Sequence, residues 1–377
     1  MAEIWAIGLM SGTSMDGIDA ALLKTDGERV AGHGAVLGDP YPAALRQRLR
    51  GILGEPGGPG GPGGEAAIAA VEAEITKAHA ALVRRLLDRA GLAPADIGVI
   101  GFHGHTIAHR PEQHYTRQIG DGGLLARLCG VPVVNDFRRA DVVAGGQGAP
   151  LVPLYHRALA RDLPRPLAVL NVGGVANITW IGADDSLLAF DTGPGNAPID
   201  DWMLRHTGQA YDAGGALAAT GLVAEVAVAR ALAQPYFARR PPKSLDRDDF
   251  SAAIAAGLAP ADGAATLTAV TAAAAAAAWR HLPAPPRQVL VTGGGRHNAT
   301  LMRMLAERLG VAVAPAAPAV LVVPVESVGW RGDALEAEAF AYLAVRACRG
   351  LALTLPSTTG APHPLTGGRL WPAPGRE

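Results

Sequence analysis

Cysteine and lysine are scarce in this chain, and each shortage excludes a class of site. The two cysteines, Cys129 and Cys348, cannot form a disulfide framework or a zinc knuckle by themselves, so we expect a reducing compartment. The three lysines are Lys24, Lys77 and Lys243. A Walker-type phosphate loop needs Gly-Lys-Ser/Thr before a helix, yet Lys24 follows a leucine and Lys243 a proline. If this chain binds phosphates, hairpin turns and helix ends must hold them.

An excess of charge of either sign is also missing. The chain has 33 basic and 34 acidic residues, so no global field attracts nucleic acid or an anionic membrane. No basic segment precedes the first strand pattern, which argues against a signal peptide. The alanine run Ala272–Ala278 is too short to span a bilayer. We therefore expect a cytoplasmic protein without nucleic-acid or membrane partners.

The length and the hydrophobic content predict an α/β protein of two domains. A chain of 377 residues that is 49% hydrophobic can bury a substantial core and exceeds the usual size of one domain. We expect one domain at 1–155, joined by the C-terminal segment 333–377, and a second domain at 156–332.

The first chemical signal is a glycine- and hydroxyl-rich turn near the N-terminus. Two apolar runs, Trp5–Met10 and Ile18–Leu23, flank the polar sequence SGTSMDG and predict a β-hairpin. The N–H groups and hydroxyls of such a tip can donate to the phosphates of a nucleotide, and Asp16 can hold a magnesium ion through water. The alternative is a glycine hairpin that only turns the chain.

The second half of the chain repeats this plan. Strand patterns at Leu167–Val172 and Ala176–Ile181 flank Gly173 and Gly174, which indicates an internal duplication. A third strand ends at Asp191, directly before the sequence TGPGN. A carboxylate at the end of a strand stands where α/β folds present their chemistry, so we predict that Asp191 is catalytic.

Two further segments give weaker signals. The strand Gln288–Thr292 enters a triple-glycine turn that begins with Gly293 and Gly294, a backbone shelf on which a base or ribose can lie. Glu336 lies near the first turn of a predicted helix, where an acid is either functional or stabilised by the helix dipole. The proline- and glycine-rich tail Thr354–Glu377 is expected to be irregular.

Two polar segments of the first half stay open to two interpretations each. His103 and His105 in HGHTIAHR are typical of the start of a zinc hydrolase site, or of a polar loop at a strand end. Arg138 and Arg139, after a strand, can bind a carboxylate or phosphate, or form a solvated turn.

Seven ordered motifs between Ile7 and about Leu343 resemble those of the anhydro-N-acetylmuramic acid kinases, a family of the actin and sugar-kinase superfamily. The motifs are MSGTSMDGID, FHGHTIAHRP, QIGD, DFRRADVVAGGQGAPLVP, NVGGVANIT, FDTGPGN and VTGGGRHN. The resemblance implies two related actin-like (ribonuclease H-like) domains with a nucleotide cleft between them.

The resemblance also implies an activity. Members of this family open 1,6-anhydro-N-acetylmuramic acid with water and phosphorylate its 6-oxygen with ATP and Mg²⁺ in peptidoglycan recycling. Asp191 matches the family's catalytic base, and Glu336 falls where the family has a glutamate near the sugar. We add Arg138, Arg139 and His105 as candidate substrate contacts. The residues expected to bind the nucleotide are Gly12, Thr13, Ser14, Met15, Asp16, Gly17, Ile18, Asp19, Gly173, Gly174, Gly293 and Gly294.

One departure and two rival functions remain. The family often has PPKSTGRE where this chain has PPKSLDRD, at Pro241–Asp248, which leaves the contacts of this loop open. The first rival is another protein with an ATP cleft, such as a sugar or acetate kinase or a nucleotide switch. The second is a zinc hydrolase built on His103 and His105. The expected partners are ATP and the anhydro sugar, with a homodimer as the open alternative to a monomer.

Overall fold

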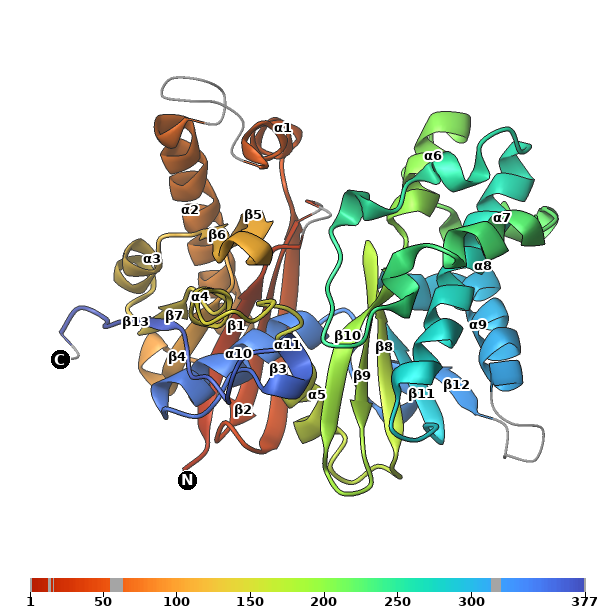
Figure 1. The fold of residues 1–377 in the computed structure, drawn as a ribbon. Helices are drawn as coiled ribbons and strands as arrows, with labels where there is room; N and C mark the ends of the chain where they lie inside the picture. The colour runs from red at the N-terminus through yellow and green to blue at the C-terminus, as the bar shows by residue number, and fades with distance from the viewer. Residues whose placement is uncertain (1, 13–14, 16, 55–63, 313–319, 376–377) are drawn as a thin grey trace. The chain divides into compact units, whose positions relative to one another are not determined.

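The computed structural model describes residues 2–12, 15, 17–54, 64–312 and 320–375. The chain divides into two compact units (Figure 1). Unit 1 comprises Met1–Arg161 and Ala334–Glu377, and unit 2 comprises Asp162–Asp333. Each unit contains a sheet flanked by helices, so the predicted α/β class is confirmed.

Unit 1 is built on a six-stranded sheet of order β13-β7-β4-β1-β2-β3, with a separate two-stranded pair, β5 and β6. The strands are β1 (Ile4–Met10), β2 (Gly17–Thr25), β3 (Val30–Pro40), β4 (Ile97–Phe102), β5 (His105–Arg110), β6 (Tyr115–Ile119), β7 (Val133–Asn135) and β13 (Arg369–Trp371). The helices are α1 (Ala43–Ile52), α2 (Glu65–Ala90), α3 (Gly122–Cys129), α4 (Arg139–Val143), α5 (Pro153–Leu159), α10 (Leu335–Cys348) and α11 (Pro356–Thr359).

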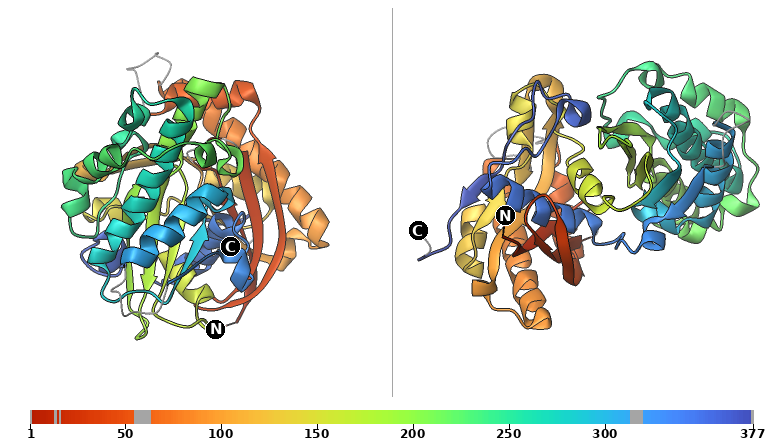
Figure 2. Two further views of the ribbon diagram at one scale, coloured as in Figure 1. Left: turned by 90° about the vertical axis from the view of Figure 1, so that its right-hand side faces the viewer. Right: turned by 90° about the horizontal axis from the view of Figure 1, so that it is seen from below.

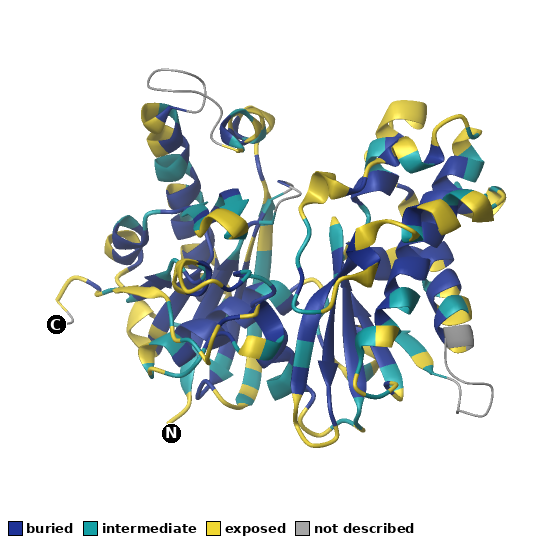
Figure 3. Ribbon diagram, viewed as in Figure 1, coloured by how far each residue is buried: buried dark blue, intermediate teal, exposed yellow. Residues whose placement is uncertain are grey.

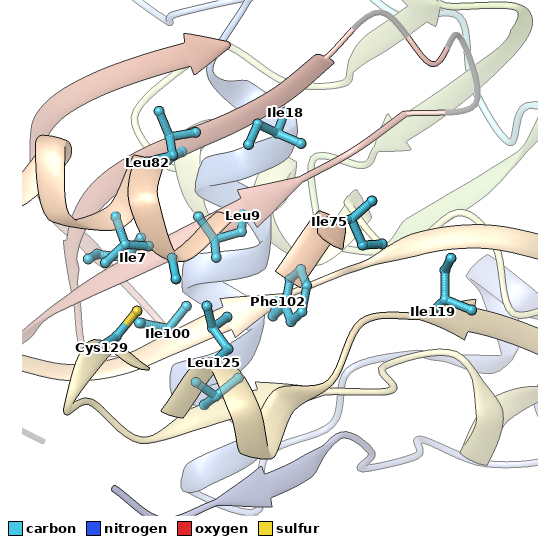
Figure 4. Close-up of a cluster of buried hydrophobic side chains, with 14 of the residues drawn as sticks. Ile7, Leu9, Ile18, Ile75, Leu82, Ile100, Phe102, Ile119, Leu125 and Cys129 are labelled. Carbon is cyan, nitrogen blue, oxygen red and sulfur yellow. The ribbon is translucent and has the colours of Figure 1, made fainter. Parts of the chain in front are cut away.

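The two faces of this sheet are covered differently. Alternate residues of β1, Ile7 and Leu9, point to the face that α2 and α3 cover, and there they join the main apolar cluster of the unit (Figure 4). Helix α10 packs on the other face, against β1, β2 and β4. Glycine permits this close approach, because a Cβ at Gly8 would lie 1.7 Å from the carbonyl oxygen of Ala337. The inner strands of both sheets are mostly buried, whereas the edge strands β3, β12 and β13 are half-buried or exposed (Figure 3).

Unit 2 contains a five-stranded sheet of order β10-β9-β8-β11-β12. Its strands are β8 (Leu167–Val172), β9 (Val175–Ile181), β10 (Leu187–Pro194), β11 (Gln288–Thr292) and β12 (Leu321–Pro324). Its α-helices are α6 (Ala197–Thr207), α7 (Glu225–Leu232), α8 (Pro260–Ala277) and α9 (Ala299–Ala312). Helices α8 and α9 pack together on one face of the sheet (Figure 2).

The sheets of the two units share one plan. In each unit an antiparallel hairpin, β1–β2 or β8–β9, is extended on one side by a third antiparallel strand, β3 or β10. On the other side two parallel strands follow, β4 and β7 in unit 1 and β11 and β12 in unit 2. This common order confirms the predicted internal duplication.

Three expectations about individual segments need correction. The tail is not wholly irregular, because it contains α11 and the edge strand β13, whose Trp371 donates a hydrogen bond to Asn135. The two arginines expected in a turn lie instead at the start of α4, with Arg138 as its N-cap and Arg139 as its first residue. The alanine run expected to be too short to span a bilayer belongs to a longer helix, α8, which begins at Pro260.

Because α8 is longer than the alanine run alone, its length and hydropathy reach those of a membrane-spanning helix. Together with the following turn, Pro260–His281 is, among the described residues, the single unbroken helical stretch long and apolar enough to cross a bilayer. In this structure 78% of its most apolar window is buried within unit 2. That burial is typical of a core helix.

Candidate functional site

In unit 2 the glycine-rich segments meet at one end of the sheet. The loop after β10 packs on the β8–β9 tip: Asn196 N–H donates to the carbonyl of Gly173 at 2.7 Å, and Gly195 N–H donates to that of Gly174 at 3.0 Å. Gly293 has a φ of +76°, and a Cβ there would lie 2.4 Å from Asn171 Oδ1. The structure therefore brings the predicted Gly173, Gly174 and Gly293 elements together.

A row of polar residues crosses the sheet just below these glycines. Asp191 on β10 pairs with Asn177 on β9, Asn177 pairs with Asn171 on β8, and Asn171 pairs with Thr292 on β11. Residues paired across neighbouring strands share a face of the sheet. We call Asp191, Asn177, Asn171 and Thr292 the polar row. Their strand neighbours, such as Val172 and Phe190, belong to the apolar cluster with α8 and α9, so the polar row lies on the opposite face.

Asp191 is held from three sides by one segment, Tyr236–Leu245. The side chain is 7% exposed, and its Oδ2 accepts a hydrogen bond from Leu245 N–H at 2.8 Å. Its backbone N–H donates to the carbonyl of Lys243 at 3.0 Å, and its own carbonyl accepts from the hydroxyl of Tyr236 at 2.5 Å. Two of these bonds hold the backbone of Asp191, and the third holds one oxygen of its carboxyl group.

Four further polar residues of unit 2, Asn171, Asn177, Lys243 and Asp200, were not predicted as site residues from the sequence. Asn171 and Asn177 are polar residues within mostly apolar strands, and this break in the pattern could have identified them from the sequence. Asn177 Oδ1 is buried without a hydrogen-bond partner among the described residues, as expected of an atom that meets a ligand. For Lys243 the sequence shows only that it does not belong to a Walker-type phosphate loop. Burial, with the neighbouring Asp201, raises the pKa of Asp200 to about 7.

In unit 1 the predicted nucleotide turn is the tip of the β1–β2 hairpin. Met15 N–H donates to the carbonyl of Gly12 at 3.0 Å, which closes the turn. The side chains of Met15 and Ile18 are buried in the apolar cluster, so these two residues offer a ligand only backbone groups. Asp19 is exposed on β2. The expectations for Thr13, Ser14 and Asp16 concern positions outside the described residues.

His105 forms a hydrogen bond with Ser11, at the start of this tip. It is fully buried, and its Nδ1 lies 2.9 Å from the hydroxyl oxygen of Ser11, which in turn lies 2.8 Å from that of Tyr41. Burial lowers the pKa of His105 to about 4, so the ring is neutral at neutral pH. Its contact with Ser11, the residue before Gly12, ties β5 to the tip.

The histidines do not form a zinc site. Arg138 donates Nε–H to His103 Nε2 at 3.1 Å, and His103 Nδ1 lies 2.9 Å from the carbonyl of Gly104. Both ring nitrogens of His109 are also in hydrogen bonds, to Thr116 and to the carbonyl of Gln147. Across the described part of the chain, no three His, Cys, Asp or Glu residues are grouped to hold a metal. The zinc-hydrolase alternative therefore loses its structural basis.

The two arginines and Glu336 occupy different settings. Arg138 is half-buried and also donates to the carbonyl of Gly148 at 2.7 Å, so it joins α4 to the β5 region. Arg139 is exposed and pairs with Asp136 at 2.9 Å. Glu336 is half-buried in the first turn of α10. The structure thus separates the adjacent arginines, one internal and one on the surface.

The chain is similar to one family over nearly its whole length. Residues 4–373 match the sequence model described as anhydro-N-acetylmuramic acid kinase. A relative of that name from Rhodospirillum rubrum is 57% identical over 98% of this chain and 95% of its own length. Another from Rhizorhabdus wittichii is 54% identical over 98% of this chain and 99% of its own length.

Solved structures resemble the chain more distantly. A ROK family glucokinase from Streptomyces griseus in complex with glucose and AMPPNP aligns with a TM-score of 0.41 and 15% identity, covering 90% of this chain and 99% of that chain. A hexokinase from Schistosoma mansoni complexed with glucose aligns with a TM-score of 0.44 and 11% identity, covering 91% of this chain and 85% of that chain.

Proposed function

Because the chain belongs to the anhydro-N-acetylmuramic acid kinase family, we propose that it converts 1,6-anhydro-N-acetylmuramic acid and ATP into N-acetylmuramic acid 6-phosphate and ADP. The observation that carries this proposal within the structure is the setting of Asp191. Its buried carboxyl group is fixed at the end of the polar row, beside the glycine turns that we assign to the nucleotide.

The proposed reaction joins a hydrolysis to a phosphoryl transfer. Asp191 takes a proton from water while the water oxygen attacks the anomeric carbon. The bond from that carbon to the 6-oxygen breaks, and its electron pair stays on the oxygen. The 6-oxygen then forms a bond to the γ-phosphorus of ATP, and ADP leaves with the electrons of the broken phosphoanhydride bond. Asp191 finally returns its proton to solvent.

Other residues take binding roles in this proposal. The β1–β2 tip, Gly12–Asp19, and the β8–β9 tip, Gly173–Gly174, bind the phosphates through backbone N–H groups. Gly293 and Gly294 form the shelf for the adenosine. Glu336 and Arg138 contact the sugar, whereas Arg139 and His105 remain weaker candidates because of their surface and buried settings.

Magnesium fits this arrangement as an ion that enters with the nucleotide. Mg²⁺ prefers phosphate, water and one or two carboxylates over a cage of protein ligands. Asp19, an exposed carboxylate at the end of the tip, offers that chemistry; Asp16, for which a magnesium role was also expected, lies outside the described residues. When bound, the ion supplies charge neutralisation at the phosphates.

The wider setting is also part of the proposal. We place the enzyme in the cytoplasm, in the recycling of peptidoglycan, with the two units as its two domains. A homodimer stays a prediction to be checked by the mass of the protein in solution.

An isotope experiment tests the proposed reaction. The protein is incubated with Mg–ATP and 1,6-anhydro-N-acetylmuramic acid in ¹⁸O-labelled water, and the products are weighed by mass spectrometry. We expect a sugar phosphate that carries one ¹⁸O, because the water oxygen enters at the anomeric carbon. Consumption of ATP with unchanged sugar would leave another ATP-cleft kinase or a nucleotide switch as the better assignment.

Removing the metal separates the kinase from the zinc-hydrolase alternative. Excess chelator is expected to lower the rate at least about tenfold, because the γ-phosphate then lacks charge neutralisation. Added Mg²⁺ should restore the rate, and added Zn²⁺ should not. Ring opening that continues in chelator without ATP, or that only Zn²⁺ restores, would contradict the proposal.

A further inference from the structure

The side chain of Lys243 is buried in unit 2, although lysine is normally exposed. It is 3% exposed, and its Nζ donates to the carbonyl of Tyr236 at 3.1 Å. The same Nζ lies 4.4 Å from the ring centroid of Tyr236 and 5.7 Å from that of Phe190. Aromatic faces attract a cation at these distances. The ammonium group therefore lies between two aromatic rings, and one of them belongs to Phe190, the residue before Asp191 on β10.

The contacts of Lys243 close a ring that includes Asp191. The carbonyl of Lys243 accepts the N–H of Asp191, and the side chain of Lys243 binds Tyr236. Tyr236 in turn donates its hydroxyl to the carbonyl of Asp191. Leu245, two residues after Lys243, donates its N–H to the carboxylate itself. Fixing the lysine side chain thus fixes the loop between α7 and α8 that holds the carboxyl group (Figure 1).

The charges of Lys243 and Asp191 are also coupled. Burial, with smaller effects of Arg239 and Arg280, lowers the pKa of Lys243 to about 8, and the negative charge of Asp191 opposes this change. Among the described residues, the charged or titratable groups that interact with Lys243 are Asp191, Tyr236, Arg239, Arg280 and His281. Asp191 is the one anion among them, so each of the two groups favours the charged form of the other.

We propose that Lys243 is the positioning residue of Asp191: its caged side chain locks the loop that orients the carboxyl group, and its ammonium charge favours the ionised carboxylate. The catalytic consequence rests on the proposed function, whereas the coupling of the two charges does not.

The scarcity of lysine makes this coupling directly measurable. Protein labelled with ¹³C at lysine Cε should show three resonances, one each for Lys24, Lys77 and Lys243. The resonance that disappears in Lys243→Arg belongs to Lys243, and we expect its titration midpoint near pH 8. In Asp191→Asn the midpoint should fall by about half a pH unit or more, because the opposing carboxylate is gone. An unchanged midpoint in Asp191→Asn would overturn the proposed coupling.

The pH dependence of kcat separates positioning from simple support of the fold. Lys243→Met should lower kcat about tenfold and move the acid limb to higher pH, because the carboxylate loses a nearby cation. Lys243→Arg should leave the acid limb in place and remove any alkaline limb near pH 8, because arginine stays charged. Lys77→Met, which removes an exposed lysine from α2, serves as the matched control and should change neither limb.

The outcomes distinguish the two proposals. A wild-type protein that forms no sugar phosphate but shows the shifted lysine midpoint in Asp191→Asn would refute the function and keep the coupling. An active wild type whose Lys243→Met variant keeps the same pH profile would refute the positioning role alone. Because the lysine titration uses the wild type and Asp191→Asn, it stands even if Lys243→Met fails to fold.

Discussion

Asp191→Asn is expected to lower kcat for the anhydro sugar by a factor of about 10²–10⁴, the range of general-base catalysis. Asparagine has nearly the same shape, and its carbonyl oxygen can still accept the hydrogen bond from Leu245 N–H. It cannot take a proton from the attacking water. The effect should therefore appear in kcat, with a smaller change in KM, because the lost interaction belongs to the transition state. Initial rates of sugar phosphate formation give both constants.

The control for this variant lies in the turn that joins β10 to its neighbour β9. Asp184→Asn changes an exposed carboxylate in the turn between β9 and β10, where Asp184 Oδ1 accepts hydrogen bonds from the backbone N–H and the hydroxyl of Ser186. Its rate should equal that of the wild type. If Asp191→Asn kept more than about a tenth of the wild-type kcat while folding normally, Asp191 would not be the base.

Gly8→Ala is expected to destabilise unit 1 by about 3 kcal/mol or more. The added Cβ would lie 1.7 Å from the carbonyl oxygen of Ala337 and 2.5 Å from the backbone nitrogen of Ala341. Both are backbone atoms of α10, so no rotamer change relieves the clash and the helix must move off β1. For a unit of this size the midpoint of thermal unfolding should fall by roughly 6–12 °C, which calorimetry can measure.

Gly51→Ala is the matched control for that prediction. Gly51 lies inside α1, and a Cβ there meets no atom within 4 Å. Alanine is the better helix former by roughly 0.5–1 kcal/mol, so this variant should unfold at the same or a slightly higher temperature. Equal midpoints of thermal unfolding for Gly8→Ala and Gly51→Ala would mean that α10 does not pack closely against Gly8 of β1.

The sequence pattern predicted the two β-hairpins, because their strands and turns lie next to one another in the chain. The apolar runs at Trp5–Met10 and Leu167–Val172, each followed by a glycine-rich turn, predicted hairpins that β1–β2 and β8–β9 confirm. Strand β13 escaped this reasoning because three residues of an edge strand carry no periodicity. Its place depends on pairing with β7, which lies more than two hundred residues earlier.

The setting of Asp191 shows the same limit within the candidate site. Its position before TGPGN was visible in the sequence, because a carboxylate at a strand end is a local pattern. The contacts of Asp191 with Lys243 and Leu245 join residues more than fifty positions apart, and the loop that carries Lys243 and Leu245 has no regular sequence pattern. The setting of His105 could not be predicted from the sequence for a related reason, since only the packed structure buries its ring against Ser11.

The division of unit 1 has a consequence for synthesis on the ribosome. Its first part ends at Arg161 and its second begins at Ala334, so the whole of unit 2 is translated between them. At about 5–20 residues per second, this interval lasts roughly 10–35 s. Throughout it, α10 has not yet been made and cannot cover the face of β1 and β4 on which it packs. Unit 2, by contrast, is continuous in sequence and is complete before the helix that finishes unit 1 has been made.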